Sequence, residues 1–88
     1  MKLSDNKQLF DYLVSLSSKL ASAGVGQPSE EVASAARTVA AIPATEFLGE
    51  ARIVLRQVLK MDAGILDDGE RADLRDVLTQ LDMALDER

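Results

Sequence analysis

Leucines recur at intervals of four, three and four residues in two widely separated stretches of this 88-residue chain. The first set is Leu9, Leu13, Leu16 and Leu20, and the second is Leu74, Leu78, Leu81 and Leu85. This spacing returns to one side of an α-helix, whereas in a β-strand the odd interval of three would divide the leucines between the two faces. The spacing therefore predicts two amphipathic helices, each with one buried stripe.

Polar residues that can cap a helix precede four segments of the chain. A cap accepts hydrogen bonds from the unpaired N–H groups of the first helical turn. The candidate caps are Ser4 or Asp5, then Ser29, Thr45 and Asp67. Glu70 follows Asp67 by three residues, which is the spacing of a capping box. These caps predict helices over about residues 5–23, 29–41, 46–61 and 68–87.

Three short breaks separate the predicted helices. Gly24 suits the left-handed residue that follows a helix, Pro43 stops the second helix, and Gly64 lies in the third break. None of the breaks is long enough to link two domains. We therefore expect residues 1–88 to form a single all-α domain, a compact antiparallel four-helix bundle.

The third predicted helix is more apolar than one neighbouring helix requires. Its apolar residues are Phe47, Leu48, Ala51, Val54, Leu55, Val58 and Leu59, with Ile53 and Met61 further round. One interpretation is a central helix that contacts several others. The other is a helix shared between the core and a homodimer interface, for which Phe47, Ile53 and Met61 form the candidate dimer face.

The chain contains no histidine and no cysteine, which limits its chemistry. It lacks an imidazole base, a thiolate nucleophile and the usual ligands of structural zinc. The acidic turn that starts at Asp62 does not match a calcium loop, because Gly64 and Leu66 occupy positions where oxygen ligands are needed. No metal and no cofactor are expected.

Carboxylates are frequent in the fourth predicted helix, including Asp73 with Asp76 and Asp82 with Asp86. They fall mainly off the leucine stripe, so we expect them to be solvated and ionised. Acid–base catalysis needs two carboxylates in different environments. The sequence therefore predicts a protein that is not an enzyme.

The acidity of the chain is concentrated at its end. Residues 1–61 carry seven Lys/Arg and six Asp/Glu, a net charge of +1, and residues 62–88 carry three Arg and nine Asp/Glu, a net charge of −6. An acidic surface disfavours nucleic acid and anionic membranes. No apolar run approaches the roughly 18 residues of a membrane span, and no secretory signal is recognisable. We expect a cytoplasmic protein that binds neither nucleic acid nor membrane.

Two charged surfaces are candidates for binding a partner protein. The acidic one consists of Asp73, Asp76, Asp82 and Asp86, and the basic one of Arg52, Arg56 and Lys60 at spacing four. The acids either only keep the protein soluble or recognise a basic partner. The basic stripe either pairs with acids of the fourth helix or docks an acidic segment or a phosphate-bearing ligand.

Together these features predict a non-enzymatic protein–protein interaction module. A small acidic helical regulator, adaptor or immunity-like inhibitor would bind a partner with a basic surface through its helices. Two alternatives stay open: a structural homodimeric bundle, and a helical carrier or small-ligand-binding domain. The alanines of the second helix favour tight packing over a ligand cavity.

Overall fold

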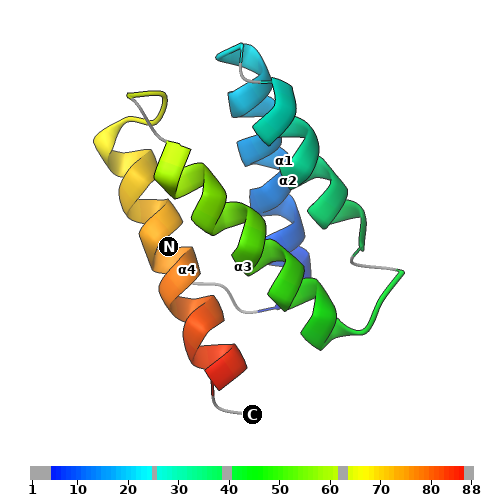
Figure 1. The fold of residues 1–88 in the computed structure, drawn as a ribbon. Helices are drawn as coiled ribbons and strands as arrows, with labels where there is room; N and C mark the ends of the chain where they lie inside the picture. The colour runs from blue at the N-terminus through cyan, green and yellow to red at the C-terminus, as the bar shows by residue number, and fades with distance from the viewer. Residues whose placement is uncertain (1–4, 25, 39–40, 62–63, 87–88) are drawn as a thin grey trace.

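The computed structural model describes residues 5–24, 26–38, 41–61 and 64–86. In these residues the chain forms four helices, α1 (Asn6–Ser22), α2 (Gly26–Arg37), α3 (Ala44–Met61) and α4 (Asp68–Asp86). Figure 1 shows α1–α2 and α3–α4 as two antiparallel hairpins. Helix α2 packs against both α1 and α3, and so joins the two hairpins. The predicted all-α four-helix bundle is confirmed.

The two leucine stripes face the core, as their spacing predicted, and supply about half of its buried residues. Seven of the eight leucines are buried and the eighth, Leu85, is half-buried. Helix α2 adds Val32 and Ala36, and α3 adds Phe47, Ala51, Leu55 and Val58. All four helices therefore share one apolar core.

The ends of α1 and α4 follow the predicted caps. The Gln8 backbone N–H donates to the Asp5 carboxylate over 2.9 Å. At α4 the Glu70 N–H donates to the Asp67 carboxylate over 2.7 Å, and the Asp67 N–H donates to the Glu70 carboxylate over 3.0 Å. Gly24 has a φ of 83°, the left-handed conformation that closes α1.

The start of α2 differs from the prediction. The helix begins at Gly26, and Pro28 lies in its first turn, where a missing N–H costs no helical hydrogen bond. Ser29 is buried inside the helix instead of capping it. Its hydroxyl donates to the Ser17 carbonyl of α1 over 2.8 Å, and the Ser17 hydroxyl donates to the Ser29 carbonyl over 3.0 Å. The cap prediction is wrong because the partner of Ser29 lies on another helix.

The connection between α2 and α3 also differs. Helix α2 ends at Arg37, four residues earlier than predicted, and α3 begins at Ala44 instead of Glu46. The Phe47 N–H donates to the Pro43 carbonyl over 3.0 Å, so the α-helical hydrogen bonds already start at Pro43. Thr45 therefore lies within the helix and does not cap it.

Parts of the predictions fall on residues outside the described ranges. These are the alternative cap Ser4, the end of the second helix at Val39 and Ala40, the turn residue Asp62, and Glu87 of the fourth helix. Within the described ranges, none of the helices has the length and apolar character needed to cross a bilayer.

Helix α3 contacts both α2 and α4, which accounts for its broad apolar surface. The candidate dimer face needs a correction. Phe47 is 0% exposed and belongs to the core, whereas Ile53 and Met61 are 54% and 50% exposed. Phe47 lies on the core side of α3, against the leucine stripes, and so has no surface to offer a second copy.

Candidate functional site

The predicted basic stripe and part of the predicted acidic face pair with each other. Arg56 lies 2.8 Å and Arg52 3.3 Å from the same carboxylate oxygen of Asp82. Arg52 also lies 4.0 Å from Asp86. This is the cross-helix pairing that was one of the two interpretations of the stripe. These four side chains connect α3 to α4 and largely neutralise each other.

The remaining predicted residues lie apart from this ion-pair cluster. Lys60 is exposed near the end of α3, beside Met61 and the α2 residue Pro28, and none of the described acids pairs with it. Asp76 is exposed on α4. Asp73 lies one turn before Asp76 and reaches a different surface, the groove between α4 and α1.

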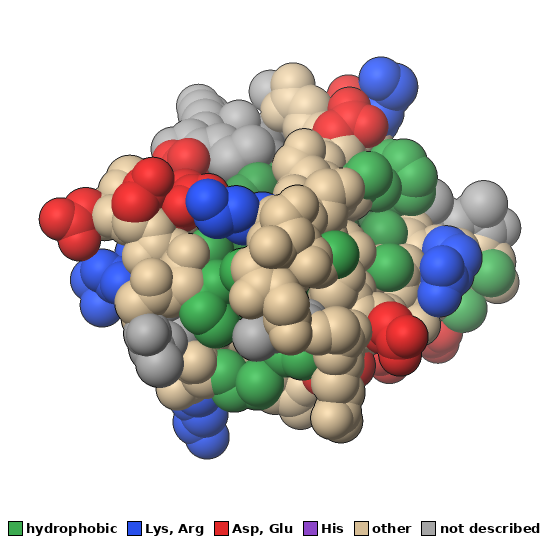
Figure 2. All heavy atoms as spheres, turned by 90° about the horizontal axis from the view of Figure 1, so that it is seen from above, with side chains coloured by type: hydrophobic (Ala, Val, Ile, Leu, Met, Phe, Trp, Pro, Cys, Tyr) green, Lys and Arg blue, Asp and Glu red, His purple; other side chains and the backbone are tan. Residues whose placement is uncertain are grey.

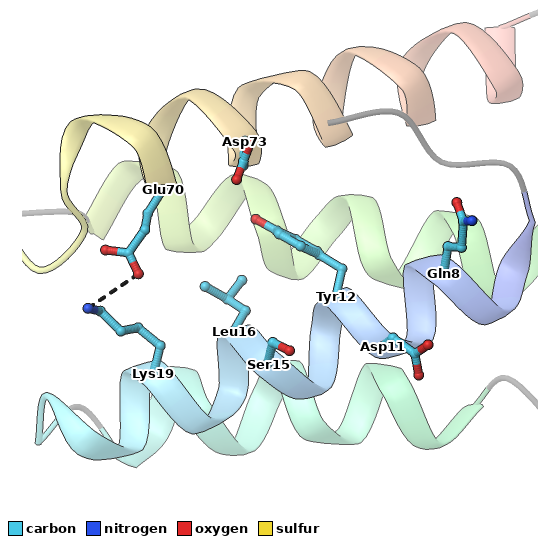
Figure 3. Close-up of a pocket in the computed structure, with 8 residues that line it drawn as sticks. All are labelled: Gln8, Asp11, Tyr12, Ser15, Leu16, Lys19, Glu70 and Asp73. Carbon is cyan, nitrogen blue, oxygen red and sulfur yellow. Dashed lines mark ion pairs between the residues drawn. The ribbon is translucent and has the colours of Figure 1, made fainter.

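An open groove of about 540 Å³ runs between α1 and α4 (Figure 3). Six residues of α1 and two of α4 line it, namely Gln8, Asp11, Tyr12, Ser15, Leu16, Lys19, Glu70 and Asp73. The lining residues of α1 recur every three or four residues, which places them on the side of the helix next to the leucine stripe. Because the stripe packs into the core, this side of α1 borders α4.

Tyr12 is the centre of this groove and the single tyrosine of the chain. Its half-buried ring packs on the core, and Figure 3 shows its hydroxyl pointing toward Asp73. Burial raises the pKa of Tyr12 well above its ordinary value of 10.0, and the negative charges of Asp73 and Glu70 raise this pKa further. The groove therefore opposes an additional negative charge.

An ion pair between the two helices closes one end of the groove. Lys19 of α1 lies 3.3 Å from the Glu70 carboxylate, which also caps α4. Figure 2 looks onto the end of the molecule where α4 begins, and shows acidic side chains gathered at its left with a basic side chain beside them. The lining holds three carboxylates and one ammonium group, and one of these carboxylates, Asp11, lies 3.6 Å from Lys7 of the same helix. The lining residues thus carry a net charge of −2, which Lys7 partly offsets at Asp11.

A second groove, of about 460 Å³, lies between α2 and α3. It contains Glu30, Glu31 and Glu50 but no aromatic side chain. In neither groove, nor elsewhere among the described residues, do three acidic side chains come together in a way that could hold a metal ion.

Sequence reasoning found Asp73 but missed Tyr12, Asp11, Lys19 and Glu70 as parts of one site. Asp73 is far from the α1 residues in sequence, and only the packing of the first helix beside the last brings them together. The sequence did contain one indication of the α1 half of this site, because polar and aromatic residues flank the first leucine stripe on one side.

Comparison of the chain with protein-family models, with curated proteins and with solved structures found no match.

Proposed function

We propose that this protein is a non-enzymatic interaction module that binds a basic segment of a partner protein in the groove between α1 and α4. One observation carries the proposal: Tyr12 stands half-buried in an open groove whose charged residues are three carboxylates and one lysine. A regulator, adaptor or inhibitor would act in this way.

The chemistry of the lining favours a partner with both apolar and cationic groups. An apolar side chain can pack on Tyr12 and Leu16, whose burial against the core gives a firm surface. A lysine or arginine beside it can pair with Asp11 or Asp73 and lie over the tyrosine ring. Tyrosine is enriched among residues that dominate binding energies, because its large ring loses little conformational freedom.

The shape of the groove favours a peptide segment over a small molecule. Small-ligand sites enclose most of the ligand surface, whereas this groove is open. A separate, smaller depression of about 180 Å³ lies where α1, α3 and α4 meet, lined by Asn6, Leu48 and Ala84 among others. A helical or extended segment fits an open groove such as the one between α1 and α4.

A peptide titration tests the proposal. The probe is a basic amphipathic peptide of leucine and lysine, compared with a leucine and glutamate peptide of equal length. We expect the basic peptide to change the fluorescence of the single tyrosine and to shift backbone amide resonances of α1 and α4, with an affinity that falls as salt rises. Shifts confined to other helices would contradict the proposal.

Paired variants separate the groove from acidity in general. Asp11→Asn with Asp73→Asn removes two charges from the α1–α4 groove, and Glu30→Gln with Glu31→Gln removes two from the α2–α3 groove. We expect roughly tenfold weaker peptide binding for the first variant and little change for the second. Equal weakening in both would show that only net charge matters, and would refute the groove as the binding site.

A further inference from the structure

The outer face of α3 contributes no residue to the α1–α4 groove, borders the α2–α3 groove through Glu50, and changes charge along its length. Its centre is Ile53, which is 54% exposed. Before Ile53 the exposed face carries Glu46 and Glu50, and after it come Gln57 and Lys60. The face therefore changes from acidic to basic along the helix, with an apolar side chain in the middle.

The charges are placed symmetrically about Ile53. Glu46 precedes it by seven residues and Lys60 follows it by seven. Seven residues are about two helical turns, so both side chains lie within roughly 20° of the direction of Ile53. If a second α3 lies antiparallel across this face with the two Ile53 side chains in contact, Glu46 of each copy meets Lys60 of the other.

The face is also open to close approach. Gly49 lies one turn before Ile53, and a Cβ atom added to it would meet no other atom within 4 Å. No side chain of the described protein therefore covers the backbone at this point. A neighbouring helix could approach there more closely than over a larger residue.

We propose that the outer face of α3 binds a second copy of this chain, in an antiparallel two-fold contact centred on Ile53. The self-complementary charge order selects this occupant, because a uniformly basic or uniformly acidic partner would be repelled by one half of the face. The contact uses neither α1 nor the α1–α4 groove, so it stands independently of the proposed function.

The dimer is weak and reversible. The contact involves one helix face from each copy, and the net charge of −5 on each chain opposes association. We expect a dissociation constant between roughly 10 µM and 1 mM. Sedimentation of the wild-type chain over this range should show a mass that rises from 9.5 kDa toward twice that value. A strictly monomeric chain at millimolar concentration would overturn the proposal.

Charge exchange tests the geometry of the contact. In the proposed dimer, residue 46 of each copy meets residue 60 of the other. Glu46→Lys therefore puts two lysines together at both of these contacts, and Lys60→Glu puts two glutamates together at both. Each variant alone should dimerise about tenfold more weakly than the wild type. An equimolar mixture should form a heterodimer, because each lysine then meets a glutamate. A mixture no stronger than the separate variants would overturn the antiparallel arrangement.

Control variants keep the result independent of net charge and of folding. Asp76→Lys and Lys7→Glu make the same charge changes on exposed sites of α4 and α1, and should leave dimerisation within about threefold of its wild-type level. Ile53→Asp should abolish the dimer while circular dichroism shows an unchanged helical content. Persistence of the dimer in this variant would overturn the proposal.

Discussion

Two apolar residues of α3, Phe47 and Ile53, lie less than two turns apart and should respond very differently to truncation. Phe47 is fully buried among the leucines of α1 and α4, so Phe47→Ala leaves a cavity in the core. Such changes cost about 3–5 kcal/mol. Ile53 is half exposed to solvent, and alanine is the better helix former, so Ile53→Ala should cost less than about 1 kcal/mol.

The size of the protein makes the difference visible. At about 0.05–0.15 kcal/mol per residue, an 88-residue domain has a free energy of unfolding of roughly 4–13 kcal/mol. Phe47→Ala therefore removes a large part of the total stability and lowers the melting temperature by about 15 °C or more. Ile53→Ala lowers it by only a few degrees.

Urea denaturation followed by far-ultraviolet circular dichroism measures both variants. The experiment belongs at low micromolar concentration, because dimerisation at higher concentration would stabilise the folded state by mass action. Similar losses of stability in the two variants, or a larger loss for Ile53→Ala, would refute the assignment of Phe47 to the core and Ile53 to the surface.

Three further predictions concern the groove and the polar contacts of the helices. Because the pKa of Tyr12 is raised, the folded state keeps its phenol protonated, so the stabilising effect is fully present below about pH 10 and is lost as the pH rises further. Tyrosinate absorbance and denaturation at increasing pH measure this loss of stability, and Tyr12→Phe should make it smaller. Ser17→Ala and Ser29→Ala should each cost about 1 kcal/mol, and the double variant about the sum of the two in urea unfolding, because each hydroxyl donates to the other residue's backbone carbonyl, which the substitution leaves in place. Asp67→Ala should lower stability by about 1 kcal/mol, whereas Glu70→Gln, which can still accept the Asp67 N–H, should cost less than half of that in the same assay.

The parts of the fold that sequence predicts well are those decided by neighbours along the chain. The Asp5 cap and the Asp67–Glu70 capping box fix the starts of α1 and α4 through contacts only three residues long. Leucine periodicity depends on local helix geometry in the same way. These elements could be placed to within one or two residues.

The parts that sequence misplaces depend on contacts between distant residues. Ser29 has the residue type of a cap, and its burial follows from Ser17, which lies twelve residues earlier on α1. Phe47 could face either the core or a partner until its neighbours on α1 and α4 are known. The groove has the same origin, because the Tyr12 and Asp73 surfaces meet only in the packed bundle.

The charged surfaces illustrate a related limit. Composition and spacing identify Arg52, Arg56 and Asp82 as residues of interest, but do not decide between a partner protein and pairing across the third and fourth helices. Their actual partners are one another. Opposite charges on adjacent helices can satisfy each other, so a charged stripe in sequence indicates binding only after the neighbouring helix has been taken into account.

The reciprocal serine contacts also determine the register of α1 along α2. Sliding α1 by one turn would break both hydrogen bonds and leave a buried hydroxyl without a partner. The same slip would carry Tyr12 about 5.4 Å along the groove, away from Asp73, and would separate Lys19 from Glu70. Two small polar side chains on the far side of α1 thus set the alignment of the surface that faces α4.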